Sequence, residues 1–103
     1  MTVEAITCTS VRRRRRARWS WRLAVMRAAD LDDAAIIALA WTIENTMPED
    51  GDCLSMPLAT IAILASLTPA DADAAMARLE RAGLVIRSLA GIHLACRTPE
   101  DRA

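Results

Sequence analysis

The chain has no tyrosine, phenylalanine or lysine, and only one histidine and three glycines among its 103 residues. Without Tyr or Phe, the core must be built from aliphatic side chains, with Trp19, Trp21 and Trp41 as its aromatic anchors. Thirteen arginines without a single lysine, together with abundant alanine, are typical of a GC-rich bacterial or phage genome.

Cysteine is also scarce. The three cysteines, Cys8, Cys53 and Cys96, are far apart in the sequence and form no Cys-X-X-Cys pair. With one histidine, the chain has poor material for a zinc site, and an odd number of scattered thiols fits a reducing cytoplasm. No uncharged apolar run approaches the ~18–20 residues of a membrane span. We therefore expect a cytoplasmic protein with no cofactor, no metal and no membrane segment. The absence of a catalytic residue set or a Gly-rich phosphate loop predicts that it is not an enzyme.

Net charge is zero, but the charges are segregated along the chain. Residues 11–27 hold eight arginines and no acid, whereas twelve of the thirteen acids lie in residues 28–103. A basic arm on an acidic body is typical of proteins that bind polyanions. We expect residues 1–18 to form a flexible arm whose phosphate contacts come from Arg12, Arg13, Arg14, Arg15, Arg16 and Arg18. A merely solvated tail is the alternative, and Trp19 and Trp21 could stack on unpaired bases.

Helical periodicity begins beside this run. Trp19, Leu23 and Met26 fall at i, i+4 and i+7, which predicts a short helix over 17–29. Asp30 is a candidate N-cap, with Asp33 three residues later, for a helix from Leu31 to about Thr46. That helix is apolar around nearly its whole circumference, so it must pack against the preceding helix or a second copy of the chain. We predict a homodimer with an interface of Trp19, Leu23, Met26, Ile36, Ile37 and Trp41.

The next segment, 46–55, is a loop. Its Glu49-Asp50-Gly51-Asp52 resembles a fragment of a calcium loop but lacks the spaced ligands and closing Glu, so we expect a solvated turn. A helix is expected after Ser55, to about Ser66, with its apolar residues inward, Leu64 among them. Thr68-Pro69 then predicts a capped second helix that ends at Gly83. Its inward face is Ala72, Ala75, Met76 and Leu79, and alternating residues over 84–88 and 92–96 predict a β-hairpin.

Helix, turn, helix and hairpin in this order resemble the winged helix-turn-helix family of bacterial regulators, in the broad MarR/ArsR-like sense. The resemblance covers roughly residues 31–97 and is most specific at the end of the third helix, Leu79-Glu80-Arg81-Ala82-Gly83-Leu84-Val85. It implies a mainly α fold with a two-stranded wing and a third helix that enters the major groove of DNA. We accordingly expect one winged-helix domain over 19–97 and a polar tail over 98–103.

Two functions remain open. The first is a small protein that binds double-stranded DNA, either a transcriptional regulator or a phage or mobile-element accessory factor. Its arginine arm would supply most contacts, with Arg78, Arg81 and Arg87 as secondary ones. The second is a winged helix that binds a protein, as an inhibitor or adaptor. It is favoured by the small, acidic exposed positions of the third helix, which we expect at Pro69, Ala70, Asp71, Asp73, Ala74 and Ala75.

Overall fold

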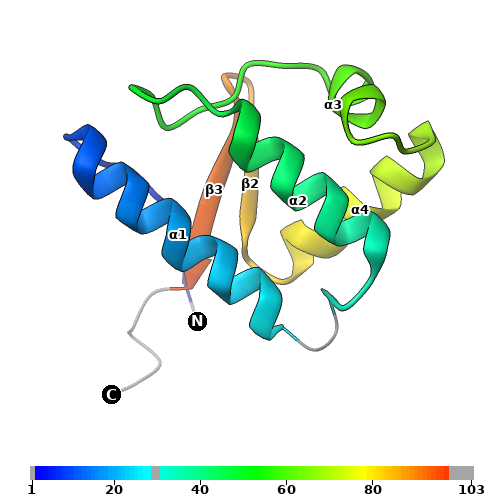
Figure 1. Cartoon of the computed structure of the whole chain (residues 1–103), viewed down its shortest axis with the longest axis horizontal. Helices are drawn as coiled ribbons and strands as arrows, with labels where there is room; N and C mark the ends of the chain where they lie inside the picture. The colour runs from blue at the N-terminus through cyan, green and yellow to red at the C-terminus, as the bar shows by residue number, and fades with distance from the viewer. Residues whose placement is uncertain (1, 29–30, 98–103) are drawn as a thin grey trace.

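The computed structural model describes residues 2–28 and 31–97, and within them the chain forms a mainly α domain of four helices and a three-stranded antiparallel sheet (Figure 1). The elements in chain order are β1 (Val3–Ala5), α1 (Val11–Arg27), α2 (Ala34–Thr46), α3 (Leu58–Leu64), α4 (Pro69–Arg81), β2 (Val85–Ser88) and β3 (Gly91–Arg97). The expected tail over 98–103 lies outside the described residues.

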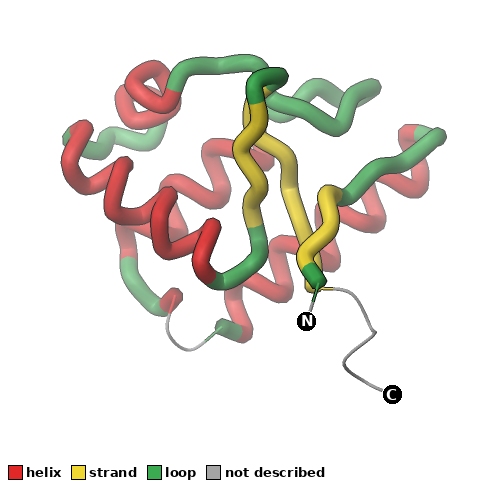
Figure 2. Tube along the Cα trace, turned by 180° about the vertical axis from the view of Figure 1, so that it is seen from behind, coloured by secondary structure: helices red, strands yellow, loops and turns green. Residues whose placement is uncertain are grey.

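The sheet has the order β1-β3-β2, so β3 is its central strand (Figure 2). On one edge β3 pairs with β2, with Val85 opposite Leu94, which confirms the expected hairpin. On the other edge it pairs with β1, with Glu4 opposite Cys96, and the backbone of Leu54 adds an isolated bridge. The N-terminal residues therefore contribute a third strand to what we expected to be a two-stranded wing.

The second helix, α2, is the centre of the domain, because it contacts α1, α3 and α4. Its all-round apolar surface is explained within one chain, since the preceding helix covers one side of it. The helix begins at Ala34, later than expected, because the Asp33 carboxylate accepts hydrogen bonds from the backbone of Ala35 at 2.8 Å and Ile36 at 3.4 Å. Asp30, the expected cap, lies outside the described residues.

Helices α3 and α4 are joined by a short turn and are bent by 106° relative to each other. As expected, Thr68 caps α4, accepting from Asp71 N at 3.1 Å, and Pro69 occupies the first turn. Pro57, not Ser55, precedes the first residue of α3, and Leu64 is 54% exposed instead of inward.

Both of these helices end in the same hydrogen-bonded motif. At the end of α4, Leu84 N donates to Leu79 O and Gly83 N to Glu80 O, with Gly83 at φ 76°. This is a Schellman motif, in which the residue after the cap adopts a left-handed conformation, and it confirms Gly83 as the terminator. At the end of α3 the same position is occupied by Ser66, at φ 58°.

The inward face of α4 is confirmed, because Ala72, Ala75, Met76 and Leu79 are all at most 2% exposed. We had expected Ala75 both on this inward face and among the exposed positions of the helix, and its burial shows that the second expectation was wrong. No single helix of the described residues is both long and apolar enough to cross a bilayer; α3 and α4 jointly have the length and composition, but with the bend between them.

Candidate nucleic-acid interface

The arginine run is not a flexible arm in this structure. Residues 11–27 form one continuous helix, α1, whose N-cap Ser10 accepts from the backbone of Arg13. Arginine is a good helix former, and the segment has no glycine or proline to interrupt it. The expected boundary between an arm over 1–18 and a domain over 19–97 therefore falls inside α1, and the expected short helix begins about six residues earlier than residue 17.

The inner face of α1 carries Arg14, Arg18, Trp21 and Val25, at i, i+4, i+7 and i+11. Trp21 is 2% exposed and its Nε1 donates to Leu84 O at 2.7 Å, which satisfies the indole in the core. The arginines extend the stripe of Trp21 and Val25 by two turns toward the N-terminus. Trp19, Leu23 and Met26 lie on the opposite face of the helix.

Arg14 anchors the first half of α1 to the loop between α2 and α3. It is 7% exposed, and its Nε donates to Asp52 Oδ1 at 2.8 Å. Its other nitrogens donate to Glu49 O at 3.0 Å and to Cys8 O at 2.6 Å. These hydrogen bonds satisfy the guanidinium in a site from which most water is excluded.

Asp52 is bound from two sides, since its second oxygen accepts from Cys8 N at 3.0 Å. The hydrogen bond from Arg14, supported by that from the Cys8 backbone, lowers the pKa of the Asp52 carboxyl below its usual value. In turn, the hydrogen bond to Asp52 raises the pKa of Arg14. The segment 49–52 is therefore not the freely solvated turn that we expected.

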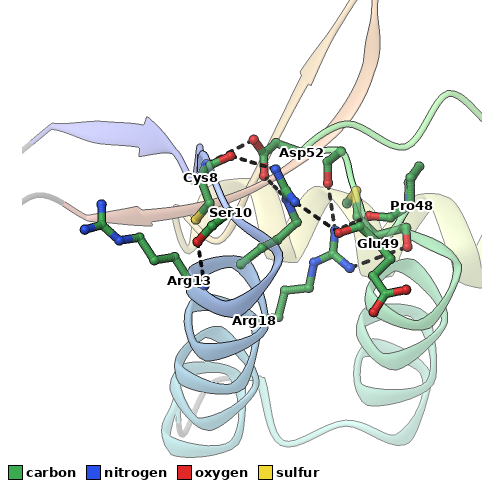
Figure 3. A network of polar contacts seen from close by, with 10 residues as sticks. Cys8, Ser10, Arg13, Arg18, Pro48, Glu49 and Asp52 are labelled. Carbon is green, nitrogen blue, oxygen red and sulfur yellow. Dashed lines mark hydrogen bonds and ion pairs between the residues drawn. The ribbon is translucent and has the colours of Figure 1, made fainter.

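Arg18 lies one turn further along the same face and binds the loop through its carbonyl oxygens (Figure 3). It donates to Pro48 O, to Gly51 O at 2.7 Å and, more weakly, to Met47 O at 3.5 Å. Partial burial, with the nearby charge of Arg14, lowers the pKa of Arg18, and an arginine stays protonated throughout the ordinary pH range. Arg14 and Arg18 thus hold α1 in place and are not available for phosphate contacts.

The remaining arginines of the run point outward. Arg12, Arg13 and Arg16 are exposed, and none of them forms an ion pair within residues 2–28 and 31–97. Arg15 pairs with Glu49, but both side chains are mostly exposed, so the pair is weak and screened. The expected phosphate-binding set is therefore divided, with four members on the solvent side of α1.

The secondary arginines are separate from this set. Arg81 is exposed in the last turn of α4, Arg78 is half-buried, and Arg87 pairs with Glu80 at 2.8 Å. The start of α1 and the α3–α4 pair lie toward opposite ends of the molecule's long axis (Figures 1 and 2), which spans 39 Å. The structure therefore does not bring the arginine run and α4, the third helix of the expected winged-helix unit, into one surface.

The residues expected at a dimer interface are divided as well. Ile36 is 4% exposed and belongs to the core of the single chain, so it is not an interface residue. Trp41 is half-buried beneath Arg22, whose guanidinium lies 5.1 Å from the ring centre and also pairs with Glu44. Ile37 and Leu23 are half-buried, whereas Trp19 and Met26 are 60% and 65% exposed. Dimerisation itself remains a prediction.

The outer face of α3 and α4 is small, apolar and acidic. Residues 55–77 contain no arginine, lysine or histidine, but include Asp71 and Asp73, both exposed. Ile63 is 77% exposed beside Leu64. A groove of about 180 Å³ lies between the two helices and is lined by Leu58, Ala59, Ala62, Pro69, Ala72 and Asp73.

Within the described residues, no three His, Cys, Asp or Glu side chains are placed to hold a metal ion, and Cys8, Cys53 and Cys96 are free thiols. The sequence signal that would have revealed the anchoring arginines is the continuation of the Trp21–Val25 stripe to Arg18 and Arg14. Comparison of the chain with protein family models, with curated proteins and with solved structures gave no match. Its function is therefore inferred from these surfaces.

Proposed function

We propose that this chain is a small nucleic-acid-binding protein of winged-helix architecture, which contacts phosphate groups mainly through the outer face of α1. The observation that carries this proposal is that Arg12, Arg13 and Arg16 are exposed on a helix fixed by Arg14 and Arg18. A regulator or a phage accessory factor acting on DNA in the cytoplasm fits this chemistry.

These three arginines form no ion pair within the described part of the chain, and their charges disfavour the start of α1. Cations in the first turn oppose the helix dipole, and like charges three or four residues apart on a helix repel each other, each effect being worth a few tenths of a kcal/mol. Phosphate groups would remove both costs and would release counterions from the nucleic acid. Because α1 is already folded and anchored, little ordering entropy would be lost on binding.

Winged-helix architecture is part of the proposal and is supported by the bent α3–α4 pair, the Schellman turn through Ser66 and the β2–β3 hairpin. The bridge from Leu54 to Ile92 supports it further, because it pairs the backbone of the loop between α2 and α3 with the edge of the hairpin. Base-specific reading by α4 is not part of the proposal, since its first two turns offer acids and alanines to a groove.

The test is the salt dependence of binding to a random-sequence duplex. With up to four phosphate contacts, the log–log slope should be about −3 to −4. The double variant Arg12→Gln/Arg16→Gln should weaken binding and reduce the slope by about 0.9 for each phosphate that is no longer neutralised. The control Arg81→Gln/Arg87→Gln removes the same charge from the end of α4 and from β2 and should leave the slope unchanged. Equal effects of the two variants would refute a specific role for α1.

A second function is favoured by the α3–α4 face, which would bind a protein segment that carries both apolar and basic side chains. Exposed Ile63 supplies an apolar contact, and Asp71 and Asp73 supply the complementary charge. Random peptides selected on the wild-type chain should be enriched in Arg or Lys next to large apolar residues. Ile63→Ser should abolish their binding, and Leu89→Ser, at an even more exposed apolar site on the hairpin tip, should not. Failure to enrich any peptide would contradict this function.

A further inference from the structure

The outer face of α1 combines its free arginines with one exposed aromatic ring. Arg12, Arg16 and Trp19 are spaced at i, i+4 and i+7, so they lie on one side of the helix, within about 10 Å along its axis. The three tryptophans differ sharply, since Trp21 is buried in the core and Trp41 is covered by Arg22. Trp19 alone among them is 60% exposed.

Nothing within the described part of the chain uses the Trp19 ring. It has no hydrogen bond, cation–π contact or ring contact there, although its neighbours on the inner face are all engaged. A large exposed indole on the same side of a helix as the exposed guanidinium groups of Arg12 and Arg16 is a combination that binds single strands, in which cations follow the backbone and bases stack on an aromatic face.

Resting on the proposed function above, we propose that the ligand of this face is a single-stranded polynucleotide, with Trp19 as the stacking platform for an unpaired base. A duplex keeps the faces of its bases stacked inside, so Trp19 would gain nothing from one beyond contact with the backbone. The inference therefore replaces the duplex that the sequence led us to expect. A single-stranded ligand also explains how the chain could bind nucleic acid although α4 is not basic.

An anionic membrane is the other polyanionic surface to consider. A helix that lies flat on a membrane carries its cations along the whole length of an apolar stripe. On α1 the exposed arginines gather at the start of the helix, up to Arg16, and the apolar residues Trp19, Leu23 and Met26 follow, with only Arg27 exposed beyond them. That arrangement favours contact of a phosphate backbone with the arginines at the start of α1 and of a base with Trp19.

The experiment compares four probes at fixed salt: a twelve-residue oligothymidylate, the same length of oligouridylate, a twelve-base-pair duplex and inorganic polyphosphate. The wild-type chain should bind the single strands more tightly than the duplex. Trp19→Ala should weaken single-strand binding by about 5- to 150-fold, the equivalent of about 1–3 kcal/mol of stacking. It should leave polyphosphate binding unchanged, Trp19→Phe should restore most of the affinity, and Met26→Ala, on the same face, should have little effect. A preference between the two single strands would show whether DNA or RNA is the ligand.

The outcomes separate the two proposals. If the duplex binds as well as the single strands, or Trp19→Ala changes nothing, this inference is overturned while the arginine-dependent binding stands. If neither form of nucleic acid binds, both fail. Binding to phosphatidylserine vesicles that is lost in Trp19→Ala, without oligonucleotide binding, would assign the face to a membrane and overturn both.

Discussion

Arg14 and Asp52 are separated by 38 residues in the sequence, yet Arg14 Nε donates to Asp52 Oδ1 at 2.8 Å. This contact, with the adjacent carbonyls of Cys8 and Glu49, fixes the start of α1 against the loop that precedes α3. It divides the arginine run into residues that hold the helix and residues that face solvent. Every proposal about the outer face of α1 depends on this division.

The first prediction concerns the anchoring role. Arg14→Gln should lower the melting temperature by several degrees, because Asp52 loses one of its two donors and the carbonyl oxygens of Cys8 and Glu49 lose the guanidinium. Arg13→Gln removes the same charge from an exposed position of the same helix and should change the melting temperature little. Thermal unfolding followed by circular dichroism measures both, and equal melting temperatures for the two variants would contradict the anchor.

The second prediction concerns pH. The folded pKa of Asp52 lies below its usual unfolded value of about 3.9, so the ionised carboxylate stabilises the fold above that value. This contribution is lost as the pH falls through the lowered folded pKa. The difference in unfolding free energy between wild type and Asp52→Asn should therefore be constant from about pH 5 to 7 and shrink below about pH 4. Urea denaturation across this range measures it, with Asp32→Asn as the control for loss of one charge. A difference that does not shrink at all below about pH 4 would count against it.

The third prediction concerns the turn between α3 and α4. Ser66 has a left-handed backbone, which costs a residue with a Cβ about 1–2 kcal/mol, and glycine avoids this strain at some entropic cost. Ser66→Gly should therefore stabilise the protein by about 0.5–1 kcal/mol in urea denaturation. Ser66→Ala keeps the Cβ and should not stabilise it. A destabilising Ser66→Gly would show that the serine side chain has a role of its own.

The fourth prediction concerns the start of β3. Gly91 has φ 140°, and a Cβ there would lie 2.3 Å from Leu54 O, in the bridge that joins Leu54 to Ile92. Gly91→Ala should cost at least about 1–3 kcal/mol of unfolding free energy, because backbone atoms would have to move. Gly51→Ala, where the nearest atom is Pro48 Cβ at 3.5 Å, is the matched control and should stay within about 0.5 kcal/mol of wild type. Comparable stabilities of the two variants would argue against the close approach.

The fifth prediction separates two neighbouring tryptophans. Trp21→Phe removes the donor to Leu84 O and leaves that oxygen without this partner, so it should cost about 1–3 kcal/mol. Trp19→Phe, on the exposed face, should be nearly neutral. Urea denaturation of the two variants tests this, and similar losses would mean that Trp19 is also part of the core.

Local patterns were sufficient where neighbouring residues determine the structure. Thr68-Pro69 predicted the start of α4, Gly83 its end, and Ala72, Ala75, Met76 and Leu79 its buried face, because caps, left-handed glycines and helical periodicity act over a few residues. The β2–β3 hairpin followed from alternation in the same way. The start of α2 was three residues off, because adjacent aspartates offered competing caps.

Four helical segments, a hairpin and the separation of basic from acidic residues could be predicted from the amino-acid order, since each depends on spacing along the chain. Which arginines are anchors and which are exposed depends on contacts between distant segments of the folded chain. A guanidinium is neutralised by whatever lies within hydrogen-bonding distance, and Asp52 and the carbonyls of the loop come from a distant part of the chain. The same holds for the three tryptophans, because packing and not residue type leaves Trp19 alone among them largely open to solvent.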